Sequence, residues 1–317
     1  DNVNRLYADE IMEKLSAHGF EASKYVLASG EQNKNMDSVL GICKACIENG
    51  LDRKSLIAAF GGGVVGDMAG FAAAIYMRGI DFIQVPTTLL SQSDSSVGGK
   101  TGVDFMNAKN ILGAFHQPKL VYINTSTLKS LPKREFISGM GEVIKHGMIR
   151  NKVFFDYLKN NKAAIEKLDS SVLADMAFEN CSIKTDVVVK DEFENGLRAD
   201  LNFGPTIGHA VEACSGFKLS HGECVGLGML AAAYIAMKRN VFSEKEFSEL
   251  ENILRDYGFK TKTEIEDTEK IREAMGKDKK TTSGKIKFVL PKNIGSVYQC
   301  TDVAEEEITA AVKYIKK

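Results

Sequence analysis

The feature that most constrains the fold is a buried-strand pattern that runs directly into a glycine-rich turn and an apolar helix. Residues 55–60 have the apolar character of a strand covered on both faces, and GGGVVGD follows them. Residues 68–77 continue as an apolar helical stretch. Strand, turn and helix in this order are the building unit of parallel α/β domains. Two more strand patterns, residues 81–85 and 119–124, therefore predict an α/β N-terminal domain.

The glycine turn is a candidate anion site. Gly61, Gly63 and Gly66 fit the GxGxxG spacing of dinucleotide binders, in which free amides at a helix N-terminus hold phosphate. The motif alone is weak, because tight packing of a strand against a helix explains the same glycines equally well. An acidic ribose partner about 20 residues further on is not obvious, and Asp81 lies too near. We therefore expect other loops to contribute to binding.

Residues 85–115, VPTTLLSQSDSSVGGKTGVDFMNAKNILGAF, predict a long loop that holds phosphate. Gly98 and Gly99 would let the backbone approach a ligand closely, and Lys100 would supply a positive charge. Lys109 and Asn110 follow shortly after. The alternative is a Gly/Ser-rich surface loop, but connections of this length inside compact domains are usually functional.

The first fifty residues predict helices around one short strand. Residues 1–19 show helical spacing and end at Gly19, and residues 37–49 form a second amphipathic helix pattern. Residues 25–28 are a candidate strand. An α/β domain usually opens with a strand, so we expect one more strand ahead of residue 1.

The length of 317 residues predicts two domains. Strand patterns give way to helical ones after residue 126, so we place a Rossmann-like domain at 1–126 and a mostly α-helical domain at 127–317. Lys and Arg number 41 against 42 Asp and Glu, and this balance argues against nucleic acid or an anionic membrane as partners. The absence of a signal-peptide pattern and of a 20-residue apolar run predicts a cytoplasmic protein.

The six cysteines predict reduced thiols rather than a disulfide framework. Cys43 and Cys46 form a CxxC motif without a second pair, and their spacing puts both on one helix face. Buried core thiols explain this pair better than zinc or redox chemistry does.

The second half contains a candidate metal or acid/base site. Glu142 and Lys145 lie at i, i+3 and share a helix face. A surface ion pair is the alternative, but the apolar residues around them predict that this pair faces an enclosed space. His209 and His221 lie within thirteen residues of each other beside glycine-rich backbone. Two histidines with Glu142 available from another helix make a metal or proton-transfer site as plausible as two core histidines.

Six motifs carry a resemblance to a known family. They are GGGVVGDMAGF, RGIDFIQVPTTLLSQSDSSVGGKTGVD, KNILGAFHQPK, LPKREFISGMGEVIKHG, DEFENGLRADLNFGPTIGHAVE and LSHGE. In this order and at this spacing they resemble the 3-dehydroquinate synthases, sugar-phosphate cyclases of the shikimate pathway, nearly end to end. The resemblance implies a lyase that pairs a Rossmann-like NAD domain with a mostly helical domain. The family also begins with a strand ahead of residue 1.

The resemblance implies a reaction without net redox change. The substrate would be 3-deoxy-D-arabino-heptulosonate 7-phosphate, and the products 3-dehydroquinate and phosphate. NAD would transiently oxidise a ring hydroxyl, which acidifies the neighbouring C–H and lets phosphate leave by β-elimination. Reduction, ring opening and an intramolecular aldol closure would follow. A divalent metal, zinc or cobalt, would polarise the reacting oxygens.

The resemblance also implies site residues. Positions matching the family's NAD contacts are Glu31, Lys34, Gly62, Gly63, Asp67, Thr87, Thr88, Asp94 and Lys109. Positions matching its substrate or catalytic groups are Lys100, Asn110, Lys145, Lys184, Arg198, Asn202, His209 and Arg78, together with one lysine of the segment 277–280. Lys145 and His209 are the candidates for proton transfer. A dimer interface is one route by which Arg78 would reach the phosphate, so we expect a homodimer.

One position departs from the family. Glu142 and His221 match two of three zinc ligands, but Pro205 stands where the family has the third, a histidine. Proline at the first turn of a helix suits the fold and offers no donor atom. His209, four residues on and on the same face, is a candidate substitute. Three functions stay open: an active synthase, a metal-deficient homologue that only binds NAD or sugar phosphate, and a related cyclase or polyol dehydrogenase.

Overall fold

The computed structural model describes residues 1–106, 108–216, 218–265, 268–276, 281–282 and 285–317. The chain separates into two compact units, Asp1–Leu128 and Lys129–Lys317. Within the described ranges, no helix combines the length and apolarity needed to cross a membrane.

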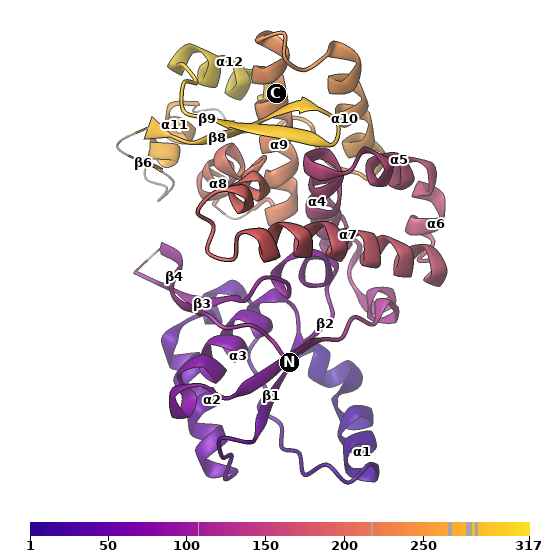
Figure 1. Ribbon diagram of the computed structural model, residues 1–317, viewed down its shortest axis with the longest axis vertical. Helices are drawn as coiled ribbons and strands as arrows, with labels where there is room; N and C mark the ends of the chain where they lie inside the picture. Colours follow the sequence, from indigo (N-terminus) through magenta and orange to yellow (C-terminus); the bar gives the residue numbers. More distant parts are fainter. Residues whose placement is uncertain (107, 217, 266–267, 277–280, 283–284) are drawn as a thin grey trace. The chain divides into compact units, whose positions relative to one another are not determined.

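The first unit is built on a three-stranded parallel sheet in the order β1-β2-β5, of which Figure 1 labels β1 and β2. The register pairs Leu56 with Asp81 and Gly61 with Pro86, so the glycine turn and the threonines that follow β2 lie at the same end of the sheet. The α/β character and the three predicted strands are confirmed. The strands of this unit are β1 (Leu56–Gly61), β2 (Asp81–Pro86), β3 (Lys100–Phe105), β4 (Ala108–Phe115) and β5 (Leu120–Val121).

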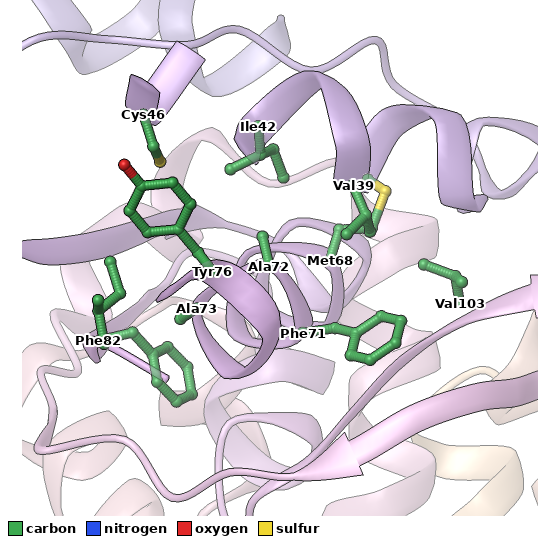
Figure 2. Packing of buried hydrophobic residues seen from close by; sticks show 11 residues of the cluster. Val39, Ile42, Cys46, Met68, Phe71, Ala72, Ala73, Tyr76, Phe82 and Val103 are labelled. Carbon is green, nitrogen blue, oxygen red and sulfur yellow. The ribbon is translucent and has the colours of Figure 1, made fainter. Parts of the chain in front are cut away.

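Helices α2 and α3 form the core of the first unit, as Figure 2 shows. Val39, Ile42 and Cys46 of α2 pack with Met68 and Phe71 of α3. Cys46 is a buried core thiol, as predicted, Cys43 packs partly buried against the same core, and the six cysteines form no disulfide. The helical segments are η1 (Asn4–Ala8), α1 (Asp9–Ala17), η2 (Glu31–Asn33), α2 (Met36–Glu48), α3 (Gly63–Ile75), η3 (Tyr76–Arg78), η4 (Ser91–Ser95) and η5 (Thr125–Ser130).

The predicted long loop over residues 85–115 is wrong in its second half, which forms the antiparallel hairpin β3-β4. Gly102 and Gly113 are partners across it, and an added Cβ would meet a backbone oxygen of the opposite strand at 2.5 or 2.1 Å. Only glycine fits at these two positions of the hairpin, although glycine inside a strand weakens the sequence pattern by which strands are predicted. Lys100 is the first residue of β3 rather than a loop residue.

The predicted strand at residues 25–28 is also wrong, because the structure assigns no strand to this described segment. Tyr25 instead packs against α2, where its hydroxyl occupies the space that a Cβ on Gly41 would need. The predicted N-terminal helix is confirmed, as π-helical η1 followed by α1.

The second unit is mostly helical, as predicted (Figure 1). Its two antiparallel strand pairs are β6 with β7 and β8 with β9. The elements are α4 (Lys133–Arg150), α5 (Lys152–Asn160), α6 (Lys162–Glu166), α7 (Ser170–Lys190), η6 (Leu197–Asn202), α8 (Pro205–Cys214), α9 (His221–Lys238), α10 (Glu244–Asp256), α11 (Thr268–Gly276), β6 (Thr281–Thr282), β7 (Lys285–Ile286), β8 (Phe288–Asn293), β9 (Ser296–Cys300) and α12 (Glu305–Ile315).

Helix α9 contacts α4 and α8 through glycines. A Cβ on Gly222 would lie 1.9 Å from the carbonyl oxygen of Ser138 in α4, and one on Gly228 would lie 2.0 Å from that of Gly204, the N-cap of α8. The Gly222 amide also donates to Ser138 Oγ at 3.1 Å. These contacts bring the helix backbones together, so side chains next to the glycines lie close across the interfaces.

We predict that Gly222→Ala lowers the thermal stability of the chain. The new methyl group would force α9 away from α4, and overpacking of this kind costs about 1–3 kcal/mol. For a unit of this size, each kcal/mol lowers Tm by about 2–4 °C.

Gly226→Ala is the matched control on the same helix. Its Cβ would meet the side chain of Phe259 at 3.1 Å instead of a backbone oxygen, and alanine favours helix by about 1 kcal/mol over glycine. Melting curves compare the two variants. Equal Tm values for both would show that the Gly222 contact is not the constraint described.

Candidate active site

The glycine turn can bind an anion and is also needed for tight packing, the two explanations that the sequence left open. Gly62 is the N-cap of α3 and supplies no side-chain cap, which leaves amides of the first turn available to an anion. The packing requirement is equally real. A Cβ on Gly62 would meet Thr88 at 3.0 Å, and one on Gly66 would meet the Gln84 side chain at 2.6 Å. The Thr87 amide donates to Gly61 O at 2.9 Å, which fixes the threonines beside the turn.

Three predicted site residues of the first unit meet in one cluster. The buried Lys34 ammonium donates to Asp67 Oδ2 at 2.6 Å and to Asn110 Oδ1 at 2.5 Å. Asn110 has a left-handed backbone with φ 51°, and its amide donates to Asp104 Oδ1 at 2.8 Å. The hairpin β3-β4 thus presents Asn110 to a lysine 76 positions earlier in the chain.

The carboxyl group of Asp67 lies in a poorly solvated place. Burial raises the pKa of Asp67 to about 6, against the lowering effect of Lys34, and the charges of Glu31 and Asp94 add to the rise. Burial therefore outweighs the ion pair. The negative charge at this end of the sheet weakens in mildly acidic solution.

The other predicted residues of the first unit lie on several separate segments. Asp94 lies in the π-helical segment η4, and its neighbour Ser95 occupies the space that a Cβ on Gly63 would take. Arg78 is exposed in a kink where three consecutive residues have positive φ, which ordinary side chains seldom adopt. The remaining predicted residues are exposed, namely Glu31, Lys100 and Lys109.

In the second unit, α4 buries two charged side chains side by side. Glu142 and Lys145 are 1% and 3% exposed and form an ion pair, which confirms that this i, i+3 pair is enclosed. Glu142 Oε1 lies 3.3 Å from His221 Nε2. The close contact of α4 with α9 at Gly222 accounts for this short distance, because His221 is the residue before that glycine.

His221 is the first residue of α9 and is held by a capping box. Ser220 Oγ accepts from the Glu223 amide, and Glu223 Oε2 accepts from the Ser220 amide at 2.7 Å. The other ring nitrogen of His221 faces α8, where Nδ1 lies 3.2 Å from Glu212 Oε2. Burial opposes the charged ring, but hydrogen bonds and charges from Glu142 and Glu212 raise the pKa of His221 to about 9.

The residues of α8 and α9 fit a divalent metal. The His209 and His221 rings lie 5.8 Å apart between centroids. One donor atom from each of His209, Glu212 and His221 lies within 4.8 Å of the other two. Two imidazoles and a carboxylate form a ligand set used by catalytic zinc. Pro205 begins α8, as predicted, and contributes no donor.

The remaining predicted residues of the second unit lie on other segments. Lys184 is buried in α7. Arg198 donates to the Glu192 carbonyl, and Asn202 Nδ2 donates to Glu194 Oε1 at 2.7 Å. Asp191 supports this turn, since its carboxylate accepts from three backbone amides, including that of Arg198 at 2.8 Å.

Sequence reasoning missed Glu212, although His-x-x-Glu places both side chains on one helix face. It also missed the capping box, which Ser-x-x-Glu ahead of an apolar run indicates. The lysine of segment 277–280 lies outside the described residues.

Comparison with known sequences agrees with this geometry. Residues 24–138 match the sequence profile of the 3-dehydroquinate synthase N-terminal region, and residues 139–281 match that of its C-terminal region. The 3-dehydroquinate synthase of Ruminiclostridium cellulolyticum is 52% identical over 301 residues, which cover 95% of this chain and 84% of the relative. That of Acetivibrio thermocellus is 50% identical over 312 residues, covering 98% and 86%.

Solved structures of sugar-phosphate cyclases have the same fold. The 2-epi-5-epi-valiolone synthase ValA of Streptomyces hygroscopicus subsp. jinggangensis, solved with NAD+ and Zn2+, gives a TM-score of 0.93 at 27% identity, covering 99% of this chain and 88% of its own. A 2-deoxy-scyllo-inosose synthase, solved with carbaglucose-6-phosphate, NAD+ and Co2+, gives 0.87 at 26% identity, covering 98% and 87%. Because both profiles match in succession and relatives are about half identical over nearly the whole chain, the chain belongs to the 3-dehydroquinate synthase family.

Proposed function

We propose that this chain is a lyase that converts 3-deoxy-D-arabino-heptulosonate 7-phosphate to 3-dehydroquinate and phosphate. The observation that carries this proposal is the buried pair of Glu142 and Lys145, joined through the partly exposed His221 to Glu212 and His209 within one helical unit. Such a group combines metal donors with a lysine next to them. Relatives of this chain that are about half identical to it are named for this activity, which also supports the proposal.

The first unit would bind NAD, within the domain that we place at 1–126. NAD supplies the reversible oxidation of one substrate hydroxyl and is itself regenerated at the end of each turnover. The α3 N-terminus would receive the pyrophosphate, and the fixed threonines Thr87 and Thr88 would flank it. Lys34 would hold Asp67 and Asn110 in place from the interior. The other NAD contacts that we propose are Glu31, Gly62, Gly63, Asp94 and Lys109.

The second unit, in the domain 127–317, would hold the metal and much of the substrate. A bound divalent cation, zinc or cobalt, supplies Lewis-acid polarisation of the substrate's oxygens. Lys145 and His209 would transfer protons. Lys184, Arg198 and Asn202, with Lys100, Asn110 and Arg78 of the first unit, would bind the carboxylate, hydroxyl and phosphate groups. Cationic and amide side chains suit this anionic, polyhydroxylated substrate.

The metal-deficient alternative rests on Pro205 alone, and the donor set of His209, Glu212 and His221 argues against it. We further propose that the protein acts as a cytoplasmic homodimer. The six cysteines, which form no disulfide, agree with a reducing compartment. Sedimentation equilibrium would test the dimer.

We predict that the purified chain releases one phosphate per 3-dehydroquinate formed when NAD and zinc or cobalt are supplied. Reduced nicotinamide should not accumulate, because the cofactor is restored within each turnover. Phosphate release, product formation and nicotinamide absorbance are followed in one reaction, and a chelator should stop it. Stoichiometric reduced nicotinamide would instead identify a polyol dehydrogenase.

We predict that Lys100→Ala lowers kcat/KM for phosphate release about 10- to 100-fold, because a hydrogen bond to a charged group is worth about 1.5–3 kcal/mol. Lys44→Ala is the control. Lys44 is an exposed α2 lysine, 3.7 Å from Glu48 in a surface pair of small energetic value. Unchanged kcat/KM in Lys100→Ala, with the same Tm as the control, would contradict the role given to Lys100.

We predict that Asp67 makes the free energy of unfolding of the chain depend on pH. The pKa of Asp67 is about 6 in the folded chain and about 4 when unfolded, so between these values the folded chain binds more protons. Its contribution to the free energy of unfolding is therefore full below about pH 4 and falls as the pH rises to about 6. The Tm of the unmodified chain minus that of Asp67→Asn should fall over this interval. A difference that grows with pH would mean that the Lys34 ion pair outweighs burial.

A further inference from the structure

The two ring nitrogens of His221 face different carboxylates. Nε2 lies 3.3 Å from Glu142 Oε1, and Nδ1 lies 3.2 Å from Glu212 Oε2. An imidazole directs its two nitrogens away from each other, so one metal ion can bind only one of them. The structure therefore contains two candidate metal positions, one on each side of this ring.

The Nε2 side is poorly supplied with ligands in this chain. Pro205, which replaces the third family ligand, has no donor atom, and its place at the start of α8 is fixed by the helix. Glu142 is also paired with the buried ammonium group of Lys145, so part of its negative charge is already neutralised. Of the family's three ligands, this side keeps one imidazole, His221, and one carboxylate, which Glu142 shares with Lys145.

The Nδ1 side offers a complete set. His209, Glu212 and His221 each offer one donor atom, and these three atoms lie within 4.8 Å of one another. Zinc with bonds of about 2.0–2.2 Å separates its tetrahedral ligands by about 3.4 Å. The 3.2 Å between Glu212 and His221 already fits, and small side-chain movements would close the rest. Glu212 is 7% exposed, and its ion pair with His221 holds the buried carboxylate next to that imidazole.

We propose that this chain binds its divalent metal through His209, Glu212 and His221 Nδ1, in place of the family position beside Glu142 and residue 205. The inference rests on the proposed function only for the presence of a divalent cation. It makes Glu212 a direct metal ligand and assigns His209 to the metal. Lys145 is then the group left for proton transfer at the substrate.

Cobalt binding to the metal-free chain tests the proposal independently of catalysis. Equilibrium dialysis against Co2+ compares the unmodified chain with Glu212→Gln and Glu142→Gln, two matched carboxylate-to-amide changes on opposite sides of His221. Glu212→Gln should lose affinity well beyond the roughly 10- to 100-fold typical of residues that only orient a ligand. Glu142→Gln should stay within that range. Circular dichroism checks that both variants fold.

Pro205→His provides the reciprocal test, because it restores an imidazole at the family position. In this background the same Glu212→Gln change should cost only roughly 10- to 100-fold, since the ion can move to the Nε2 side. Imidazole nitrogen shifts in NMR of the zinc-loaded unmodified chain should report coordination through His221 Nδ1 and through His209.

Three results would overturn the proposal. They are loss of cobalt binding in Glu142→Gln with retention in Glu212→Gln, a His221 signal coordinated through Nε2, and an unmodified chain that does not bind Co2+. A chain that binds cobalt as proposed but releases no phosphate from the heptulosonate phosphate would contradict the proposed function and leave this inference standing.

Discussion

The second unit depends on the close contact of α9 with its neighbours. At Gly222 and Gly228 the backbone of α9 comes so near to α4 and α8 that a single methyl group would overlap a carbonyl oxygen. Helices that meet through side chains stand about 8–10 Å apart and place intervening atoms between their axes. At the glycines no side chain separates the helices. Residues next to the glycines on different helices therefore come within hydrogen-bonding distance of one another.

The ionisable residues of this unit follow from that contact. Glu142 on α4 is far in sequence from Glu212 on α8 and His221 on α9, yet both carboxylates lie beside the His221 ring. Each would be costly to bury alone, and each offsets the charge of another. The capping box at Ser220 fixes where α9 begins and therefore where the His221 ring stands. The first unit uses a similar arrangement, in which buried Lys34 joins Asp67 to Asn110 on the hairpin.

Local patterns predicted much of this fold. The parallel strands β1 and β2, the glycine turn, the mostly helical second half and the position of Pro205 all follow from periodicity and glycine or proline preferences. The hairpin β3-β4 could not be predicted in this way, because Gly102 and Gly113 weaken the strand signal at the points where the two strands must approach. Glu212 was missed for another reason. Its importance comes from a helix that begins only at residue 221, and no local pattern around residue 212 reports that contact. The functional roles given to individual site residues stay predictions.

The central claim is that helix contacts in this unit build a metal site that does not need a ligand at position 205. Anomalous diffraction from crystals of the cobalt-loaded chain measures the position of the ion directly. The account predicts one strong peak bonded to His209, Glu212 and His221 Nδ1, with Glu142 still paired to Lys145. A peak bonded to Glu142 and His221 Nε2, with Glu212 merely hydrogen-bonded to the ring, would contradict it.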